Sequence, residues 1–198
     1  MRSSGAMAEL AIPDPACVVL IGPAGAGKST FAARHFPASS ILSSDALRAA
    51  FGTGEADQAA SRAAFAALHR ALDRRLAAGQ FAVVDATNLT HAARRAIRAI
   101  ANRHGIPIVA IVLDLPPREV HARNAARRGR QVPTAVVDRH LAQLRAIVDT
   151  DELAAEGYAR IELVHSDLEL DALRIRLVPG PRVSGAVWRS GRHHDPGT

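Results

Sequence analysis

Short, continuous apolar runs alternate along the chain with longer segments in which apolar residues recur every three or four positions. The short runs are typical of strands buried on both faces, and the spaced pattern is typical of amphipathic helices. Strands are predicted at 17–21, 39–43, 81–84, 106–113 and 159–164, with a further one at 173–178. Helices are predicted at 27–36, 44–51, 58–78, 90–104, 118–128 and 134–148.

This order of elements predicts an α/β fold with a parallel five-stranded sheet and helices on both faces, because parallel strands need crossover helices. In the helix predicted at 58–78, one face carries Phe65, Leu68, Leu72 and Leu76. That stripe is predicted to face the core rather than a site. Ligands of such sheets bind beyond the carboxyl ends of the strands, so the side chains that follow each strand are the candidates for function.

The length of 198 residues suits one folded domain, predicted at 16–178. Residues 1–15 are expected to be a disordered lead-in without the features of a signal peptide. Residues 179–198 are expected to be a flexible basic tail, because Pro, Gly, Ser and Arg replace the apolar pattern there. No apolar run approaches the roughly 20 residues of a membrane span, and the lone Cys17 cannot form an internal disulfide. A cytoplasmic protein is therefore expected.

The first predicted strand leads into Gly22-Pro23-Ala24-Gly25-Ala26-Gly27-Lys28-Ser29, which matches the pattern G-x-x-x-x-G-K-[ST]. A strand before this motif and a helix after it are the context that a phosphate-binding loop requires. Backbone N–H groups of such a loop, together with the helix N-terminus, surround phosphate groups. The segment through Thr30 is therefore predicted to bind ATP or another NTP. Lys28 is predicted to reach the β- and γ-phosphates, and Ser29 to ligate Mg²⁺.

Arginine dominates the basic residues, and Lys28 is the only lysine among 25 Lys and Arg. A compact ammonium on a flexible stem suits the phosphate loop in a way that a planar guanidinium does not. The formal net charge of +6 also suits a polyanionic partner such as nucleic acid.

Asp45 follows the strand at 39–43, and Arg48 lies three residues later on the same helix face. One interpretation is catalytic: Asp45 accepts the proton of an attacking hydroxyl, and Arg48 holds a neighbouring phosphate. The other interpretation is structural, because an aspartate near a helix N-terminus complements the helix dipole and pairs with an arginine at i+3.

Asp85 ends the apolar strand at 81–84, which is the arrangement of a Walker-B carboxylate that holds Mg²⁺ directly or through water. The alternative is an aspartate that caps the strand-to-helix turn. Asn88 nearby would either orient Asp85 or cap the next helix, and the sequence leaves both roles open.

Arg123 and Arg127 lie one turn apart on a predicted helix, and Arg130 follows them. Like charges at this spacing repel each other unless anions meet them. In a phosphoryl-transfer enzyme, they would suit a helical lid, here at about 117–148, that neutralises charge on the transferred group. A surface face of solvated arginines is the alternative.

Four segments together make the sequence similar to a known family: VLIGPAGAGKSTF at 19–31, LSSDALR at 42–48, VVDATN at 83–88 and RNAARRGRQV at 123–132. The chain resembles the kinase domain of bacterial polynucleotide kinase–phosphatase, related to the phage-type 5′-hydroxyl polynucleotide kinases, from about Val18 to Val164. The first segment is common to all P-loop kinases. Its combination with D-x-x-R and the arginine lid is typical of a much smaller group of proteins. The resemblance implies a P-loop NTPase fold of the nucleoside-monophosphate-kinase type with an arginine-bearing lid.

The resemblance also implies transfer of the γ-phosphate of ATP to the 5′-OH end of RNA or DNA, as in end repair. Asp45 would be the general base on that hydroxyl, and Arg48 would bind the adjacent phosphate. The loop with Lys28 and Ser29 would bind the ATP phosphates and Mg²⁺. Arg123 and Arg127 would be lid arginines on the transferring phosphate, and Arg130 would be a further nucleotide-binding residue. The family's phosphatase and adenylyltransferase modules are not expected after about Val178, so separate phosphatase and ligase proteins would be partners.

Two other functions remain open on the sequence alone. One is a small-molecule kinase of the same fold, either zeta-toxin-like or acting on a sugar or nucleoside, because the fold does not fix the acceptor. The other is an ATP-dependent switch or hydrolase that binds a protein partner. The sequence leaves open the choice of DNA or RNA, the NTP donor and the oligomeric state. The loop after Val164 is the candidate for the adenine pocket.

Overall fold

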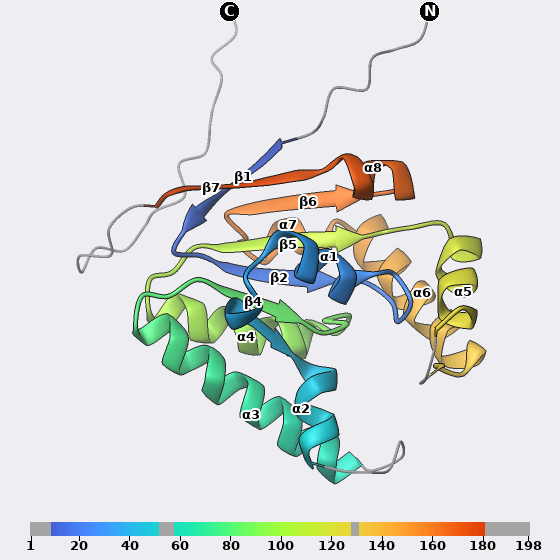
Figure 1. Ribbon diagram of the computed structural model, residues 1–198, viewed down its shortest axis with the longest axis horizontal. Helices are drawn as coiled ribbons and strands as arrows, with labels where there is room; N and C mark the ends of the chain where they lie inside the picture. The colour runs from blue at the N-terminus through green and yellow to red at the C-terminus, as the bar shows by residue number, and fades with distance from the viewer. Residues whose placement is uncertain (1–8, 52–57, 128–130, 181–198) are drawn as a thin grey trace, which may run out of the picture.

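A five-stranded parallel sheet forms the centre of the computed structural model, which describes residues 9–51, 58–127 and 131–180. The strand order is β3-β4-β2-β5-β6, and the arrows labelled β4, β2, β5 and β6 point the same way in Figure 1. The strands are β2 (Cys17–Ile21), β3 (Ile41–Ser43), β4 (Ala82–Asp85), β5 (Ile108–Leu113) and β6 (Arg160–Val164). Because every pairing is parallel, the carboxyl ends of all these strands meet at one edge.

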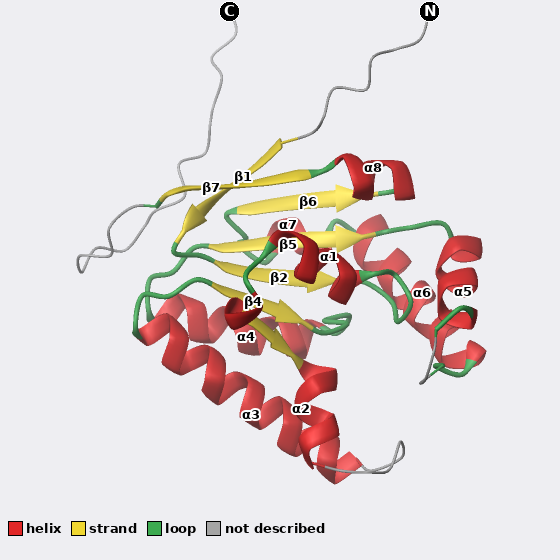
Figure 2. Ribbon diagram, in the orientation of Figure 1, coloured by secondary structure: helices red, strands yellow, loops and turns green. Residues whose placement is uncertain are grey.

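Helices connect the strands and cover both faces of the sheet (Figure 2). They are α1 (Lys28–His35), α2 (Ser44–Phe51), α3 (Gln58–Ala77), α4 (His91–Arg103), α5 (Pro117–Ala125), α6 (Thr134–Asp149), α7 (Glu152–Ala155) and α8 (Asp167–Ala172), with a 3-10 turn η1 (Ala38–Ser40). Within the described part of the chain, no helix is long and apolar enough to cross a membrane.

The alternation of side chains along β2 divides the core into two layers. Val18 and Leu20 belong to a cluster that includes Phe31 of α1 and residues of α5, α6 and α8. Val19 and Ile21 belong to the opposite cluster, with residues of α3, α4, α6 and α7. Both faces of the strand are therefore buried, which explains why it is apolar at every position.

The predicted fold class, with its five parallel strands and flanking helices, is confirmed. Most boundaries agree to within a residue, and three differ by more: residues 39–40 belong to η1, β5 begins at Ile108, after Pro107, and α5 ends at Ala125 instead of 128. The short helices α7 and α8 were not predicted, because four or six residues are too few to show a helical period.

A second, two-stranded parallel sheet corrects the prediction for the N-terminal segment. Instead of a disordered lead-in over all of 1–15, residues Glu9–Asp14 form β1, which pairs with β7 (Arg174–Pro179). Leu10 and Ile12 are fully buried and belong to the same cluster as Val18. Two alternating apolar residues beside prolines are too short a signal to predict a strand.

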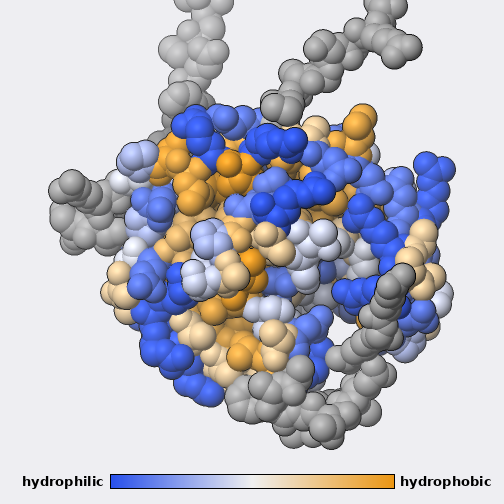
Figure 3. Space-filling model, in the orientation of Figure 1, coloured by the Kyte–Doolittle hydropathy of each residue, from blue (hydrophilic) through white to orange (hydrophobic). Residues whose placement is uncertain are grey.

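β7 confirms the further strand predicted at 173–178, and it includes the first residue of the predicted tail. Residues 1–8 and 181–198 lie outside the described chain. Leu177 of β7 is 41% exposed, and hydrophobic residues (orange) reach the surface near the top of the view in Figure 3, where β7 and α8 lie.

Because Leu10 is fully buried in the core, Leu10→Ala is expected to lower the free energy of unfolding by about 2–5 kcal/mol. The matched control is Leu177→Ala on β7. It is expected to lower the free energy of unfolding by well under half of that amount, because Leu177 is 41% exposed. Urea unfolding followed by circular dichroism measures both. Equal, small losses for the two variants would contradict the place of β1 in the fold.

Candidate active site

The segment 22–29 forms the turn from β2 into α1, and its glycines let it lie close against α5. Gly25 and Gly27 have φ of 90° and 92°, in the left-handed region. A Cβ on Gly25 would lie 2.8 Å from the Val120 carbonyl oxygen, and one on Gly27 would lie 2.6 Å from Nη1 of Arg123. A side chain at either position would therefore strain the backbone, and it would push the loop away from the α5 backbone at Gly25 and displace the Arg123 side chain at Gly27.

Lys28 opens α1 and turns back over the loop. Its Nζ donates to the carbonyl oxygens of Gly22 at 2.9 Å and Pro23 at 2.8 Å. Burial lowers the pKa of this ammonium to about 8, although the negative charges of Asp85 and Asp45 act in the opposite direction. A phosphate group beside Lys28 would add to those negative charges and favour the protonated form.

Ser29 and Asp85 bring two side-chain oxygen atoms together at the mouth of the loop. Ser29 Oγ donates to Asp85 Oδ2 at 2.7 Å. The sheet places them together, because Asp85 at the end of β4 is in register with Leu20 of β2 and Ser43 of β3. A hydroxyl and a carboxylate fit Mg²⁺, which takes few protein ligands and completes its octahedron with phosphate and water.

The described residues hold no cluster of three or more His, Cys, Asp or Glu suited to a metal. The Ser29–Asp85 pair is consistent with a cation that also needs the oxygens of a bound nucleotide.

The turn after β4 is bonded directly to the beginning of the phosphate loop. Asn88, which has φ of 50°, donates from Nδ2 to the Leu20 carbonyl oxygen at 2.8 Å. The Gly22 N–H donates to the Thr87 carbonyl oxygen at 3.1 Å. Thr90, rather than Asn88, caps α4 by accepting from the Ala93 N–H. Asn88 thus ties two strand ends together, a third role beside the two that the sequence left open.

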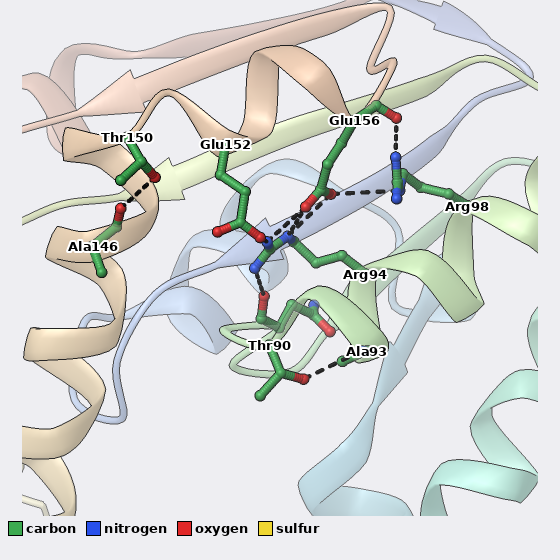
Figure 4. A network of polar contacts seen from close by, with 9 residues as sticks. Thr90, Ala93, Arg94, Arg98, Ala146, Thr150, Glu152 and Glu156 are labelled. Atoms are coloured by element: carbon green, nitrogen blue, oxygen red, sulfur yellow. Dashed lines mark hydrogen bonds and ion pairs between the residues drawn. The ribbon is translucent and has the colours of Figure 1, made fainter.

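A buried ion network holds this turn in place (Figure 4). Arg94 of α4 is fully buried and donates to the Asn88 carbonyl oxygen at 3.1 Å. Its guanidinium also pairs with Glu156 and Glu152, each at 2.7 Å, and Arg98 contacts Glu156 as well. A buried guanidinium needs such partners to offset its lost hydration. Arg94 could not be identified from the sequence, because its partners are distant along the chain.

Asp45 and Arg48 lie on α2 and form an ion pair at 3.0 Å. This is the contact that the structural interpretation describes. Both residues also line one cleft, of about 650 Å³, with Lys28 and Asp85, which is the placement that the catalytic interpretation requires. The Asp45 side chain is 67% exposed, whereas that of Arg48 is 22% exposed. Within the described structure, the buried Arg48 Nε has no hydrogen-bond partner.

The same cleft brings together most of the residues predicted to form the site. Those that line it are Ala24, Gly25, Gly27, Lys28, Ser29, Thr30, Asp45, Arg48, Asp85, Arg123 and Arg127. Gly22, Pro23 and Ala26 supply carbonyl oxygens that accept from Lys28 or Arg123. Arg130 lies outside the described residues.

Arg123 of α5 bridges the phosphate loop and α8. It donates to the Ala26 carbonyl oxygen at 2.9 Å and pairs with Asp167 at 2.5 Å. The helix predicted at 118–128 ends at Ala125, so Arg127 lies beyond the end of α5 rather than on it, and it is exposed. Beyond the loop that follows β6, Leu170 and Asp171 of α8 line the cleft as well. That loop therefore leads directly into one wall of the cleft.

Phe65 and His140 are among the lining residues that sequence reasoning did not assign to the cleft. Phe65 was predicted to be core, yet it is only partly buried, whereas Leu68, Leu72 and Leu76 of the same stripe are at most 1% exposed. Phe65 lies nearest the start of α3, where the stripe extends past the core. His140 of α6 accepts from the Ala24 N–H at 3.4 Å through Nδ1. Burial lowers its pKa, as do the charges of Lys28 and Arg139. A single histidine on a helix carries no motif that could have identified it.

A family model described as an AAA domain matches residues 17–149, which is more than half of the chain. No curated protein shows significant sequence similarity. Three solved structures illustrate the shared fold. A sugar kinase from Janibacter sp. HTCC2649 is 21% identical with a TM-score of 0.54, covering 76% of this chain and 85% of that one.

The second structure is the PezAT toxin–antitoxin system of Streptococcus pneumoniae, at 14% identity and a TM-score of 0.56, covering 77% of this chain and 67% of that one. The third is AvrRxo1-ORF1:AvrRxo1-ORF2 with ATP, at 16% identity and a TM-score of 0.59. The match covers 77% of this chain and 55% of that one. At these identities the likeness concerns the fold alone, and a fold does not fix an acceptor. On the family match and the geometry of its phosphate loop, the chain belongs to the AAA domain family and has the α/β fold of the P-loop kinases.

Proposed function

We propose that this chain is a Mg²⁺-dependent kinase that transfers the γ-phosphate of ATP, or of another NTP, to the 5′-hydroxyl end of RNA or DNA. The observation that carries the proposal is the shared cleft, in which the phosphate loop lies with the Asp45–Arg48 pair of α2. The carboxylate suits deprotonation of a hydroxyl, and the guanidinium suits an adjacent phosphodiester.

On the donor side, the loop N–H groups and Lys28 would bind the nucleotide phosphates. Ser29 and Asp85 would hold Mg²⁺, which when bound neutralises charge on the β- and γ-phosphates. Arg123 and Arg127 would add positive charge near the transferred group. The adenine is proposed to bind against the wall of the cleft that Leu170 of α8 forms.

On the acceptor side, Asp45 Oδ1 already accepts from Arg48, so the other carboxylate oxygen is proposed to take the hydroxyl proton. The Arg48 guanidinium, on a side chain that lines the cleft and is 22% exposed, would bind the phosphate next to that hydroxyl. A sugar or other neutral alcohol would leave this donor unused, which is why we favour a polynucleotide acceptor. The formal net charge of +6 supports the same choice.

Asp45→Asn is expected to lower kcat for a 5′-OH oligonucleotide by about 10²-fold or more, because the amide cannot accept the proton. ATP binding is expected to persist, since the loop and Lys28 are unchanged. Transfer of labelled γ-phosphate and equilibrium ATP binding measure the two effects. The matched control is Asp138→Asn on α6, which removes a 59% exposed carboxylate outside the cleft and is expected to turn over normally. Normal turnover in Asp45→Asn would exclude Asp45 as the base.

ATP binding at pH 8 is expected to take up protons. The pKa of Lys28 is about 8 in the protein, so about half of the ammonium groups are deprotonated there, and the bound phosphates raise the pKa. The affinity for ATP should correspondingly fall as the pH rises from about 7 to 9. Calorimetry in two buffers of different ionisation enthalpy measures the uptake, and Lys28→Met should remove it. Equal proton uptake by the wild-type protein and Lys28→Met would contradict the assignment of this uptake to Lys28.

A further inference from the structure

A second cleft, of about 510 Å³, opens beside the first and takes no part in the mechanism described so far. Its walls come from α3, α4 and α6 and from the turn after β4. Phe65, Thr87 and His140 line both clefts, so the two share a wall. A ligand whose reacting end lies near Asp45 could therefore extend past these three residues into the second cleft.

The interior of the second cleft suits a planar, partly apolar group. Leu68, Val84 and Ile97 are among the apolar residues that line it. Two rings, those of Phe65 and His69, lie along α3 with centroids 6.5 Å apart. Rings of this kind are surfaces against which nucleic-acid bases stack irrespective of sequence.

The charges of the side chains around the second cleft disfavour a cationic ligand. All of its lining residues are described, and none of them is Asp or Glu. Arg139 supplies a permanent positive charge. Burial lowers the pKa of His69 and of His140, so both are largely neutral near pH 7. A neutral or anionic ligand fits this set of side chains, and a phosphodiester would complement Arg139.

Asn88 contributes an unused acceptor to the same cleft. Its side chain is 3% exposed, and its Oδ1 has no hydrogen-bond partner among the described residues, although Nδ2 is bonded to Leu20. A buried acceptor without a partner is costly. An N–H or O–H of a bound nucleotide, such as an exocyclic amine or a ribose hydroxyl, would satisfy it.

We propose that the second cleft binds the part of the acceptor strand that follows the 5′-terminal hydroxyl, with a base against Phe65 and His69 and a phosphate beside Arg139. This inference rests on the proposed function and deepens it. The first cleft would carry out the transfer, and the second would make the enzyme prefer a strand over a single nucleotide.

The test compares two acceptors, a nucleoside 3′-monophosphate and a 5′-OH hexanucleotide, each at saturating ATP and Mg²⁺. For the wild-type protein, the KM of the hexanucleotide is expected to be lower by about tenfold or more, the value of one stacked base. Ala96→Leu enlarges a side chain of α4 that lines the second cleft, so the ratio of the two KM values should fall toward one. Ala99→Leu, on the exposed face of the same helix, should keep the wild-type ratio.

A second pair of variants serves if Ala96→Leu fails to fold by circular dichroism. Arg139→Gln should weaken hexanucleotide binding and reduce the slope of log K against log salt by about one, as expected for one lost phosphate contact. Arg145→Gln, an exposed arginine of the same helix that does not line the second cleft, should leave the slope unchanged.

Three results would overturn the inference. A wild-type KM ratio in folded Ala96→Leu, or equal salt slopes for Arg139→Gln and Arg145→Gln, would remove the second cleft from acceptor binding while leaving the kinase assignment in place. A wild-type protein that phosphorylates both acceptors with equal KM would do the same. A wild-type protein that phosphorylates neither acceptor would overturn both this inference and the proposed function.

Discussion

Parallel pairing between β2 and β4 is the constraint on which the site depends. It places Asp85 in register with Leu20, two residues before the phosphate loop begins. The Asn88 side chain then bonds to Leu20, and the Gly22 N–H bonds to Thr87, so the ends of the two strands are fixed to each other. Because β3 pairs with β4 in the same direction, α2 begins at this edge and carries Asp45 and Arg48 to it. A change of register would separate the proposed donor and acceptor groups.

The ion network around Arg94 supports this arrangement from the opposite side of the turn. A fully buried guanidinium contributes little stability on balance, since its desolvation offsets much of its attraction to Glu156. The network instead fixes the position of the turn, because Arg94 can satisfy its donors only when α7 and the Asn88 carbonyl oxygen are in their present places. Arg123 has a comparable place at the front of the loop, between Ala26 and Asp167.

Much of the fold could be predicted because β2, β4 and β5 are buried on both faces; β2 and β5 are therefore apolar at every position, and β4 is apolar at every position before Asp85. The phosphate loop and Asp85 could be found because a motif and a strand end mark them. β1 was missed because two buried apolar residues are too short a signal and because its pairing strand, β7, is far away in sequence. For the same reason, Phe65, Arg94 and His140 have roles set by partners that no local pattern reveals. The placement of Asp45 beside Lys28 follows from topology, whereas its identity as a base remains a prediction.

The most direct test of the central claim is a single competition experiment with labelled γ-phosphate. The wild-type protein, ATP and Mg²⁺ would be incubated with 5′-hydroxyl DNA and RNA oligonucleotides, the same strands already bearing a 5′-phosphate, and a panel of sugars and nucleosides. The account predicts label on the 5′-hydroxyl strands, none on the 5′-phosphorylated strands, and little on the small alcohols. Label on a sugar or nucleoside, or ATP hydrolysis with no labelled strand, would contradict it.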